Sequence, residues 1–478
     1  MDALRYGLGE RVFARMLAVC GFALFGWMLW HSFANASTHF AGSAGTVATL
    51  VLGASAIALA LAYAMDRRLG RTASLAVVLA IAVGLRLVWI FAVDTQPVSD
   101  FLDMHAAALS AANGDVSFGT NDYFSRWAHQ LGFTFYEALV IKLFGPDMIV
   151  LKLFNVLFQA GTAVVVYLSA AKAFGEAAGK TAALLYALYV PHIMMCSVLT
   201  NQHISVFFYF LGLYLLIRNR FAGTVDWLLI GLCFGIGNWM RPLGSFFLVG
   251  LLAYAGLFLL APRIRERKWP GLVAKCFGVL AVYWLLQQAA GFALTQAGVT
   301  PYPLSIQEPY WKLMIGLNPD TNGVWSYDDT VYVMQFPLGE ERNRAELELL
   351  KERLRDKGKV AALFVSKTKA MWGAEDSAPM WSLAELDKPE LYKRTVQAER
   401  IQYVVMALFG LIATAALAYR GMSAEASLFA LLLLGYAALH VVIEVQTRYR
   451  FDIFPCVFVL QSFGAAVLLN ALKKRLQR

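Results

Sequence analysis

The sequence predicts an all-α polytopic membrane protein with about twelve transmembrane helices, and three observations lead to that class. Of its 478 residues, 59% are hydrophobic and only 15% are charged, whereas soluble domains are nearer half apolar and a quarter charged. Apolar segments long enough to cross about 30 Å of hydrocarbon recur along most of the chain. Lysine and arginine gather in alternate short loops, which indicates that successive loops lie on opposite sides of a membrane.

The apolar segments can be placed one by one. The expected spans cover residues 16–33, 46–65, 74–93, 149–173, 180–195, 203–218, 226–240, 243–261, 271–293, 402–419, 425–441 and 453–472. With a cytoplasmic amino terminus, nearly all lysine and arginine of the short loops fall on the inner side, so we expect both termini in the cytoplasm. We expect no cleavable signal peptide, because the first apolar run leads into further spans. The net charge of +9 then reflects membrane orientation, and nucleic acid is not an expected partner.

Two long loops are expected on the outer side. The first contains "FTFYEALVIKLFG", which is too short to span and is typical of a juxtamembrane helix in the interface. The second contains "GEERNRAELELLKERLRDKGK", a charged helix with acid-to-base pairs four residues apart, and we expect a small helical cap. The expected parts are two extra amino-terminal helices (1–73), a transmembrane core (74–293) with the first long loop (94–148), the second long loop or cap (294–400), and carboxy-terminal helices (401–478).

The stretch "SDFLDMHAAALSAANGD", residues 99–115, places two acids and a histidine directly after the third expected span. Ser99 or Asp100 could cap a helix that begins at Phe101 and stops at Gly114. Alternatively, a carboxylate between the bilayer and a water-filled cleft could act as a general base toward a hydroxyl group. Residues alone leave both interpretations open.

Several segments together resemble the GT-C class of membrane glycosyltransferases, and more narrowly the group of protein O-mannosyltransferases and lipid A aminoarabinose transferases. The segments that carry this resemblance are, in order, "SDFLDMHAAALSAANGD", "HQLGFTFYEALVIKLFG", "SVLTNQHISVFFYFLGLYLLIR", "GLCFGIGNWMRP" and "QTRYRFDIFP". The resemblance covers roughly residues 75–470. The chain departs from the pattern at Asp103, where relatives often carry an aromatic residue, and at Asn201 and Gln202, near a position where they often carry an acid. It also has two extra spans before the core.

The resemblance implies an inverting transfer of a sugar from a polyprenyl-phosphate donor to an acceptor hydroxyl at the outer face, with Asp100 as the general base. The acceptor would be a glycan, a lipid or a protein, and the location a bacterial inner membrane. The leaving phosphate needs cations, and arginine suits phosphate because its planar fork donates two parallel hydrogen bonds. Arg448, Arg450 and Arg241 lie at the outer ends of spans and are the candidates. The alternative for each is that it extends toward lipid headgroups.

Other residues are weaker candidates for substrate or metal binding. Asp103 and His105 could join Asp100 in a divalent-metal site, since a helix places residues 100 and 103 on one side; no other cofactor is expected. Glu308, Tyr310 and Trp311 open the second long loop and could hold a sugar ring, or form an aromatic belt at the interface.

Two other functions compete with glycosyl transfer by this route. A transporter or flippase would show repeats and polar residues near the membrane midplane, whereas here the ionisable residues cluster outside. A polymerase or ligase for lipid-linked sugars would carry a large late outer loop, which this chain has, but the early acidic loop would then have no role.

Overall fold

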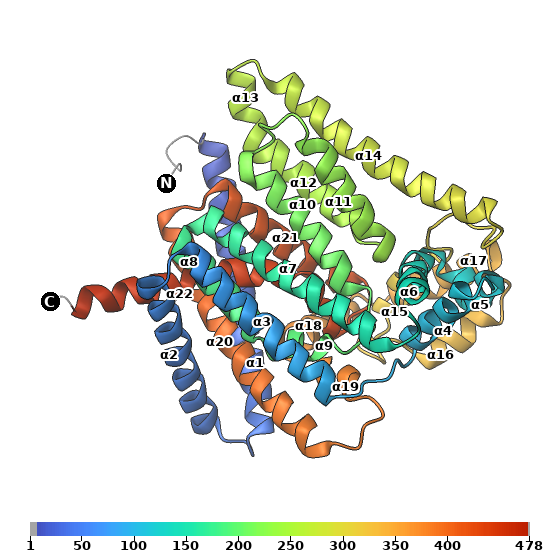
Figure 1. Ribbon diagram of the computed structural model, residues 1–478, viewed down its shortest axis with the longest axis horizontal. Helices are drawn as coiled ribbons and strands as arrows, with labels where there is room; N and C mark the ends of the chain where they lie inside the picture. The colour runs from blue at the N-terminus through green and yellow to red at the C-terminus, as the bar shows by residue number, and fades with distance from the viewer. Residues whose placement is uncertain (1–6, 477–478) are drawn as a thin grey trace.

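The computed structural model describes residues 7–476 and is built from helices throughout (Figure 1). The helices outside the two long loops are α1 (Leu8–His39), α2 (Ala44–Arg68), α3 (Arg71–Ala92), α7 (Met148–Phe174), α8 (Glu176–Leu188), α9 (Val190–Met195), α10 (Gln202–Asn219), α11 (Asp226–Met240), α12 (Gly244–Tyr254), α13 (Ala261–Arg265), α14 (Trp269–Gln296), α20 (Pro389–Arg420), α21 (Ala424–Val442) and α22 (Phe454–Leu476). Within residues 7–476 no strand forms, and one isolated antiparallel bridge joins Trp127 to Ile306.

Nine helices in this part of the chain are long and apolar enough to cross a membrane, and they coincide with nine of the twelve expected spans. The other three expected spans, at residues 180–195, 203–218 and 226–240, do not qualify. The first is broken between α8 and α9 at Tyr189, two residues before Pro191. The third forms α11, whose 15 residues extend only about 22 Å at 1.5 Å per residue. The expected all-helical class is therefore confirmed, but the count of twelve is not.

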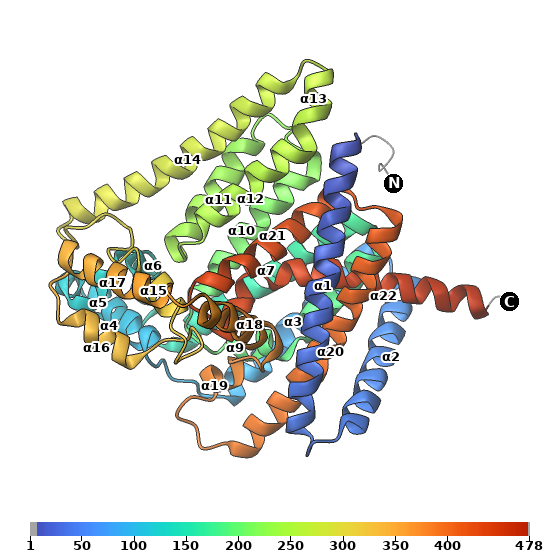
Figure 2. The same ribbon diagram turned by 180° about the vertical axis from the view of Figure 1, so that it is seen from behind.

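The middle of the protein is formed by the more buried of these helices. α20 packs against α1 and α22, and α10 packs against α7 and α11. In the most apolar 18-residue stretch of α20, 61% of the residues are buried. The corresponding share in α14, which packs mainly on α11 at the edge, is 11%. The extra amino-terminal helix α1 is thus an integral part of the helix packing. Figure 2 shows it lying along α20 from the other side.

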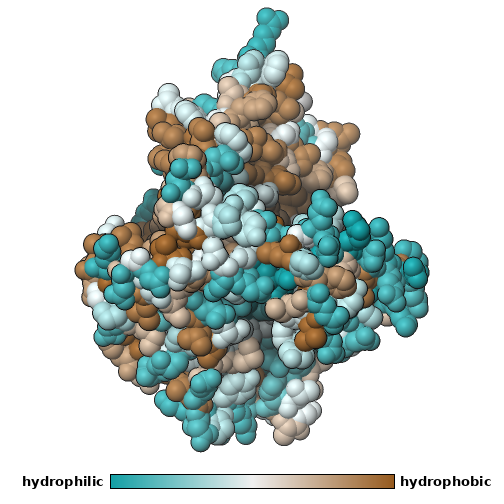
Figure 3. All heavy atoms as spheres, turned by 90° about the vertical axis from the view of Figure 1, so that its right-hand side faces the viewer, coloured by the Kyte–Doolittle hydropathy of each residue, from teal (hydrophilic) through white to brown (hydrophobic). Residues whose placement is uncertain are grey.

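The two long loops fold into short helices, most of which gather at one end of the molecule, while α18 and α19 pack under the helix bundle (Figures 1 and 2). The first loop forms α4 (Asp100–Ala112), α5 (Asp122–Arg126) and α6 (Leu131–Phe144), and the second forms α15 (Trp311–Gly316), α16 (Tyr327–Met334), α17 (Glu340–Arg353), α18 (Lys357–Gly373) and α19 (Ala378–Ser382). α4, α5, α6, α15, α16 and α17 lie together, away from both chain ends (Figure 1). Viewed from this end, hydrophilic side chains dominate the middle of the surface and hydrophobic ones gather above (Figure 3).

Local sequence signals explain where several of these helices begin and end. The Asp147 side chain accepts the Ile149 amide at the start of α7, and Asp356 accepts two amides at the start of α18. The charged stretch expected as one helix is divided by that cap into α17 and α18. α4 ends one residue before Asn113, and Gly114 then has φ +90°, a conformation that glycine adopts without steric cost. The expected stop at Gly114 is confirmed.

Candidate active site

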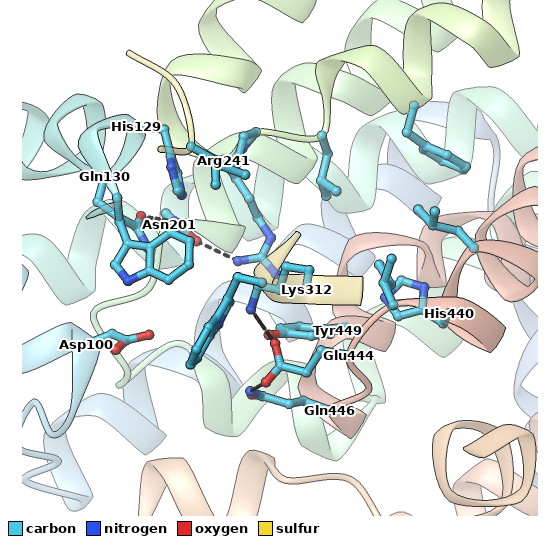
Figure 4. A pocket seen from close by; sticks show the side chains of 18 of the residues that line it. Asp100, His129, Gln130, Asn201, Arg241, Lys312, His440, Glu444, Gln446 and Tyr449 are labelled. Carbon is cyan, nitrogen blue, oxygen red and sulfur yellow. Dashed lines mark hydrogen bonds and ion pairs between the residues drawn. The ribbon is translucent and has the colours of Figure 1, made fainter. Parts of the chain in front are cut away.

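A cavity of about 690 Å³ lies where the first long loop meets α15 and the ends of α12 and α21. Part of the lining carries polar groups from distant parts of the sequence, including Asp100, Arg241 and Lys312 (Figure 4). Arg448 also lines the cavity. Another part of the lining is largely apolar and comes from Leu243, Phe246 and Val249 of the α12 region and Leu439 of α21, with Ser245 and His440 of the same helices beside them. Val249 is 66% exposed on the outside of the helix bundle. The cavity therefore joins a charged compartment to an apolar flank.

Asp100 is the first residue of α4 and lines this cavity. Ser99, the residue before it, has φ +54° and forms no side-chain cap. This left-handed conformation is unfavourable for a residue with a side chain, and such strain is concentrated at functional sites. Helix capping thus does not account for either residue. Figure 4 shows the Asp100 carboxylate in the cavity without a drawn hydrogen-bond partner.

Arg448 lines the same cavity from a 3-10 segment, Thr447–Asp452, which leads into α22. Its Nε donates to Gln446 Oε1 at 2.6 Å, and its guanidinium stacks 4.8 Å from the Trp381 ring centroid and 5.2 Å from that of Phe101. Among the described residues, no carboxylate lies within ion-pair distance of it. The aromatic rings fix its orientation without neutralising it, so Arg448 brings an uncompensated positive charge to the cavity.

Arg241 enters the cavity from the end of α11 and is held on two sides. Its Nε donates to Asp452 Oδ2 at 3.0 Å, and a terminal nitrogen donates to Asn201 Oδ1 at 3.2 Å. Asn201 in turn donates to Gln130 Oε1 at 3.2 Å, as drawn in Figure 4. Asn201, noted in the sequence as a departure, is thereby an orienting partner of the arginine.

Lys312 and Glu444 form an ion pair in the cavity that the sequence interpretation missed. Gln446 Nε2 donates to Glu444 at 2.7 Å, and the Tyr449 hydroxyl donates to it at 3.1 Å. Burial opposes the charged form of Glu444, but the Lys312 ammonium outweighs it and lowers the pKa of this carboxyl below its usual value. The pair is therefore ionised. Its sequence signal is slight: Lys312 follows Trp311, and Glu444 precedes the arginine segment by a few residues.

His129 and Tyr123 present polar atoms to the cavity that no protein group satisfies. The Nδ1 atom of His129 and the hydroxyl of Tyr123 are buried without a hydrogen-bond partner. Burial, together with Lys312 and Arg241, lowers the pKa of His129 to about 3, so the imidazole is neutral at physiological pH. Buried polar atoms are normally paired, and these two are available to a hydroxyl-rich ligand.

Of the weak substrate-binding candidates, Trp311 lines the cavity, and Arg126 lies 4.9 Å above its ring centroid. Glu308 is instead fully buried and bonded to Arg126 and Arg342 at 2.9 Å each. Tyr310 does not line the cavity. Glu308 therefore belongs to an ion-pair cluster that joins the two long loops, and the structure does not place it for contact with a sugar.

Arg450 does not line the cavity, although it stands two residues from Arg448. Its side chain is completely buried and donates to the carbonyls of Thr447, Ala374 and Glu375 at 2.9–3.1 Å. Residues two apart project differently in a 3-10 segment with three residues per turn. The expected role of Arg450 in phosphate binding is therefore not supported by its position, which is that of an internal brace.

The structure also does not gather the weak metal candidates into one site. Asp103 is exposed on α4, where burial and then the neighbouring Asp100 raise its pKa. His105 points to Glu137 of α6, with Nδ1 3.3 Å from Oε2. Among residues 7–476, no three His, Cys, Asp or Glu side chains cluster as metal ligands would. We therefore assign no residue of this chain to a metal.

Residues 129–286 match the family model for dolichyl-phosphate-mannose-protein mannosyltransferases. No curated protein sequence matches the chain. Among solved structures, the archaeal oligosaccharyltransferase AglB from Archaeoglobus fulgidus, in complex with an inhibitory peptide and a dolichol-phosphate, has 14% identity and a TM-score of 0.49 over 85% of this chain and 51% of its own. The apo form of the Archaeoglobus fulgidus oligosaccharyltransferase has 14% identity and a TM-score of 0.48 over 87% and 52%. The chain thus spans about half the length of these structures. The family match confirms the resemblance to GT-C glycosyltransferases drawn from the sequence.

Proposed function

We propose that this protein is an inverting membrane glycosyltransferase that moves a sugar from a polyprenyl-phosphate donor to an acceptor hydroxyl. One observation carries the proposal: the Asp100 carboxylate, the Arg448 guanidinium without a carboxylate partner, and a largely apolar flank all line one cavity. The carboxylate suits the reacting hydroxyl, the guanidinium suits the donor phosphate, and the apolar flank suits the lipid tail. The match of residues 129–286 to a mannosyltransferase family supports the same chemistry.

The donor phosphate binds Arg448, with Arg241 and Lys312 nearby. Arg241 is balanced by Asp452 and Lys312 by Glu444, so Arg448 supplies the net positive charge that the anionic phosphate needs. As the sugar departs, a full negative charge develops on the phosphate oxygen, and preorganised cations stabilise this charge. The isoprenoid tail leaves along Leu243, Phe246 and Val249, where the cavity meets the lipid-facing surface.

The sugar occupies the part of the cavity lined by Tyr123, His129 and Trp311. The unpartnered hydroxyl and imidazole accept or donate hydrogen bonds to sugar hydroxyls, and the indole offers an apolar ring surface. This division resembles ligand sites in general, which combine apolar walls with a few oriented polar groups.

Asp100 is the general base. The acceptor oxygen attacks the anomeric carbon and forms the new C–O bond, and its proton passes to the Asp100 carboxylate. The bond from the anomeric carbon to the phosphate oxygen breaks, and its electron pair leaves with the polyprenyl phosphate. A single displacement of this kind inverts the anomeric configuration.

We place the reaction on the extracytoplasmic side of a bacterial inner membrane, with the amino terminus in the cytoplasm. The support is the concentration of lysine and arginine in the loops opposite the two long loops. Helices α4, α5, α6, α15, α16 and α17 of those loops also lie away from both chain ends (Figure 1).

The test is sugar transfer by the purified protein in lipid nanodiscs, supplied with a panel of polyprenyl-phosphate sugars. D100N should lower the release of polyprenyl phosphate by about 100-fold or more, because it removes a positioned base. D103N is the matched control: it makes the same change on an exposed carboxyl one turn further along α4, outside the cavity. Equal loss in both variants, unchanged activity in D100N, or no donor cleaved by the wild type would contradict the proposal.

The products of the same assay separate the competing functions. A transporter would move the lipid-linked sugar across the bilayer without cleaving it. A polymerase or ligase would transfer a lipid-linked glycan from a pyrophosphate carrier and leave the monophosphate sugars untouched.

A further inference from the structure

A second cavity, of about 530 Å³, meets the first at Asp100 and Arg448. Both residues line both cavities, as do Trp325 and Gln446. The volume falls in the range of about 300–1,000 Å³ that is usual for small-molecule sites. The proposed base and the proposed phosphate ligand therefore lie on the boundary between two separate compartments.

The two cavities suit the two substrates of a displacement reaction. In an inverting transfer, the attacking oxygen and the leaving phosphate lie on opposite sides of the anomeric carbon. The first cavity contains four cations, of which Arg126, Arg241 and Lys312 are paired with carboxylates and Arg448 is not, and the apolar flank that fits the donor. The second is bounded by α18 and α19, so a molecule bound there reaches Asp100 without crossing the donor site.

The chemistry of the second cavity limits what it can bind. Among the described residues that line it, Asp100 and Arg448 are the only ionisable ones. The others are aromatic, aliphatic, hydroxyl-bearing or amide side chains, such as Trp325, Trp381, Met380 and Ser377. Arg448 is engaged by the donor phosphate, so a negatively charged acceptor would face Asp100 with no cation to spare.

Two groups in this cavity are open to a ligand. The Ser377 hydroxyl is buried without a hydrogen-bond partner and does not cap α19, although the residue stands at its amino end. Trp325 is 50% exposed, and its ring meets the Tyr327 ring edge to face with 6.4 Å between the centroids. Trp381, by contrast, is already covered by Arg448 and Phe101. A hydrogen-bonding hydroxyl beside a free indole face is an arrangement that fits a sugar ring.

We infer that the second cavity is the acceptor site and that the acceptor presents an uncharged sugar ring, with Trp325 and Ser377 as its contacts. The inference rests on the proposed glycosyl transfer and names the acceptor class for it. Acceptors whose reacting ring bears phosphate or carboxylate are excluded by the lack of a second free cation.

The test uses the whole protein in nanodiscs with a donor that it cleaves, and it compares three acceptors. The first two are an octyl disaccharide and the same disaccharide carrying a phosphate on its terminal ring. The wild type should use the neutral acceptor at least about tenfold better in kcat/KM. A serine- and threonine-rich peptide is the third acceptor, and efficient transfer to it would overturn the assignment of a sugar. Equal use of the phosphorylated disaccharide would overturn the exclusion of charge.

A variant at the cavity mouth isolates the acceptor site from the donor site. Met380 is 49% exposed and lines only the second cavity, so M380W should narrow it and raise the KM of the neutral acceptor about tenfold or more. The KM of the donor and its slow hydrolysis by water should stay unchanged. M334W, at an exposed methionine of α16 outside both cavities, is the control. An unchanged acceptor KM in M380W, or an equal rise in the donor KM, would overturn the inference.

The two proposals fail in distinguishable ways. If the wild type cleaves no donor, with any acceptor or with water, glycosyl transfer itself is wrong. If donor cleavage depends on Asp100 but the neutral disaccharide is not glycosylated, only the acceptor class is wrong.

Discussion

The two carboxylate oxygens of Asp452 are divided between Arg241 and Gln202. Oδ2 accepts from Arg241 Nε at 3.0 Å, and Oδ1 accepts from the Gln202 amide at 2.9 Å. Gln202 also donates to the carbonyl of Arg448 at 3.1 Å. One side chain of α10 therefore positions both arginines proposed to bind phosphate, one through its carboxylate partner and the other through its backbone.

Changing Asp452 to asparagine should weaken donor binding without removing any residue that touches the donor. D452N removes the buried negative charge that holds the partly buried Arg241 guanidinium in place, so the arginine is no longer fixed in its orientation toward the donor phosphate. We expect the donor KM to rise about tenfold and the acceptor KM to change little, measured by steady-state kinetics in nanodiscs. An unchanged donor KM would show that Arg241 does not contribute to donor binding.

The same substitution should lower activity at Arg448 and stability at Arg450. R448Q removes the unpaired cation from the cavity and should lower kcat/KM for the donor about 100-fold with little change in thermal stability. R450Q leaves the buried carbonyls of Ala374 and Glu375 unpaired, each at a cost of about 1–3 kcal/mol, and should lower the unfolding temperature. The checks are donor kinetics and thermal unfolding of both variants. A catalytic defect in R450Q without destabilisation would restore it as a phosphate ligand.

Glu346 should make the protein less stable as the pH rises. It is buried in the cluster that joins the two long loops, with both carboxyl oxygens unpartnered by side chains, and burial followed by the neighbouring Glu308 raises its pKa to about 8. The folded protein keeps this proton up to about pH 8, whereas the unfolded chain loses it near the ordinary value of 4.5. Stability from this group is therefore present below pH 4.5 and is lost between pH 4.5 and 8.

E346Q removes that titration and tests it. The variant should match the wild type near pH 4.5 and exceed it at pH 8.5 by about 1–3 kcal/mol, the cost of burying an unsatisfied polar group, as measured by unfolding at several pH values. E348Q, at the neighbouring acid of α17 for which the structure shows an exposed side chain, is the control. A constant difference across the pH range would refute the assignment.

Lys367 of α18 should hold the second long loop against the end of α21. It is fully buried, and its Nζ donates to the carbonyls of Gly316 at 2.5 Å and Ile443 at 2.8 Å. These carbonyls lie close in sequence to Lys312 and Glu444. K367M should lower the unfolding temperature and also raise the donor KM, whereas K369M at an exposed position of α18 should do neither. Destabilisation without any kinetic change would limit Lys367 to a structural role.

Some site residues could be found from the sequence because their position along the chain revealed them. Asp100 follows a span directly, and Arg241 and Arg448 lie at span ends, where a charge is costly unless it serves a purpose. Lys312 and Glu444 could not be found in this way. They are 132 residues apart, and only the packing of α15 against the end of α21 brings them together. Arg450 was wrongly grouped with Arg448 because the two arginines share one sequence context. In the structure Arg448 lines the cavity, whereas Arg450 is buried against backbone carbonyls.

The sequence by itself determined the helical class and the positions of nine candidate membrane spans, because hydropathy and charge act over short distances along the chain. Only the tertiary structure decided that the expected span at residues 180–195 breaks between α8 and α9 and which arginine lacks a carboxylate partner. It also showed that Asp100 lies between two cavities. Those properties depend on contacts among residues far apart in sequence, where burial and ion pairing are settled by packing, and local composition does not encode the partner.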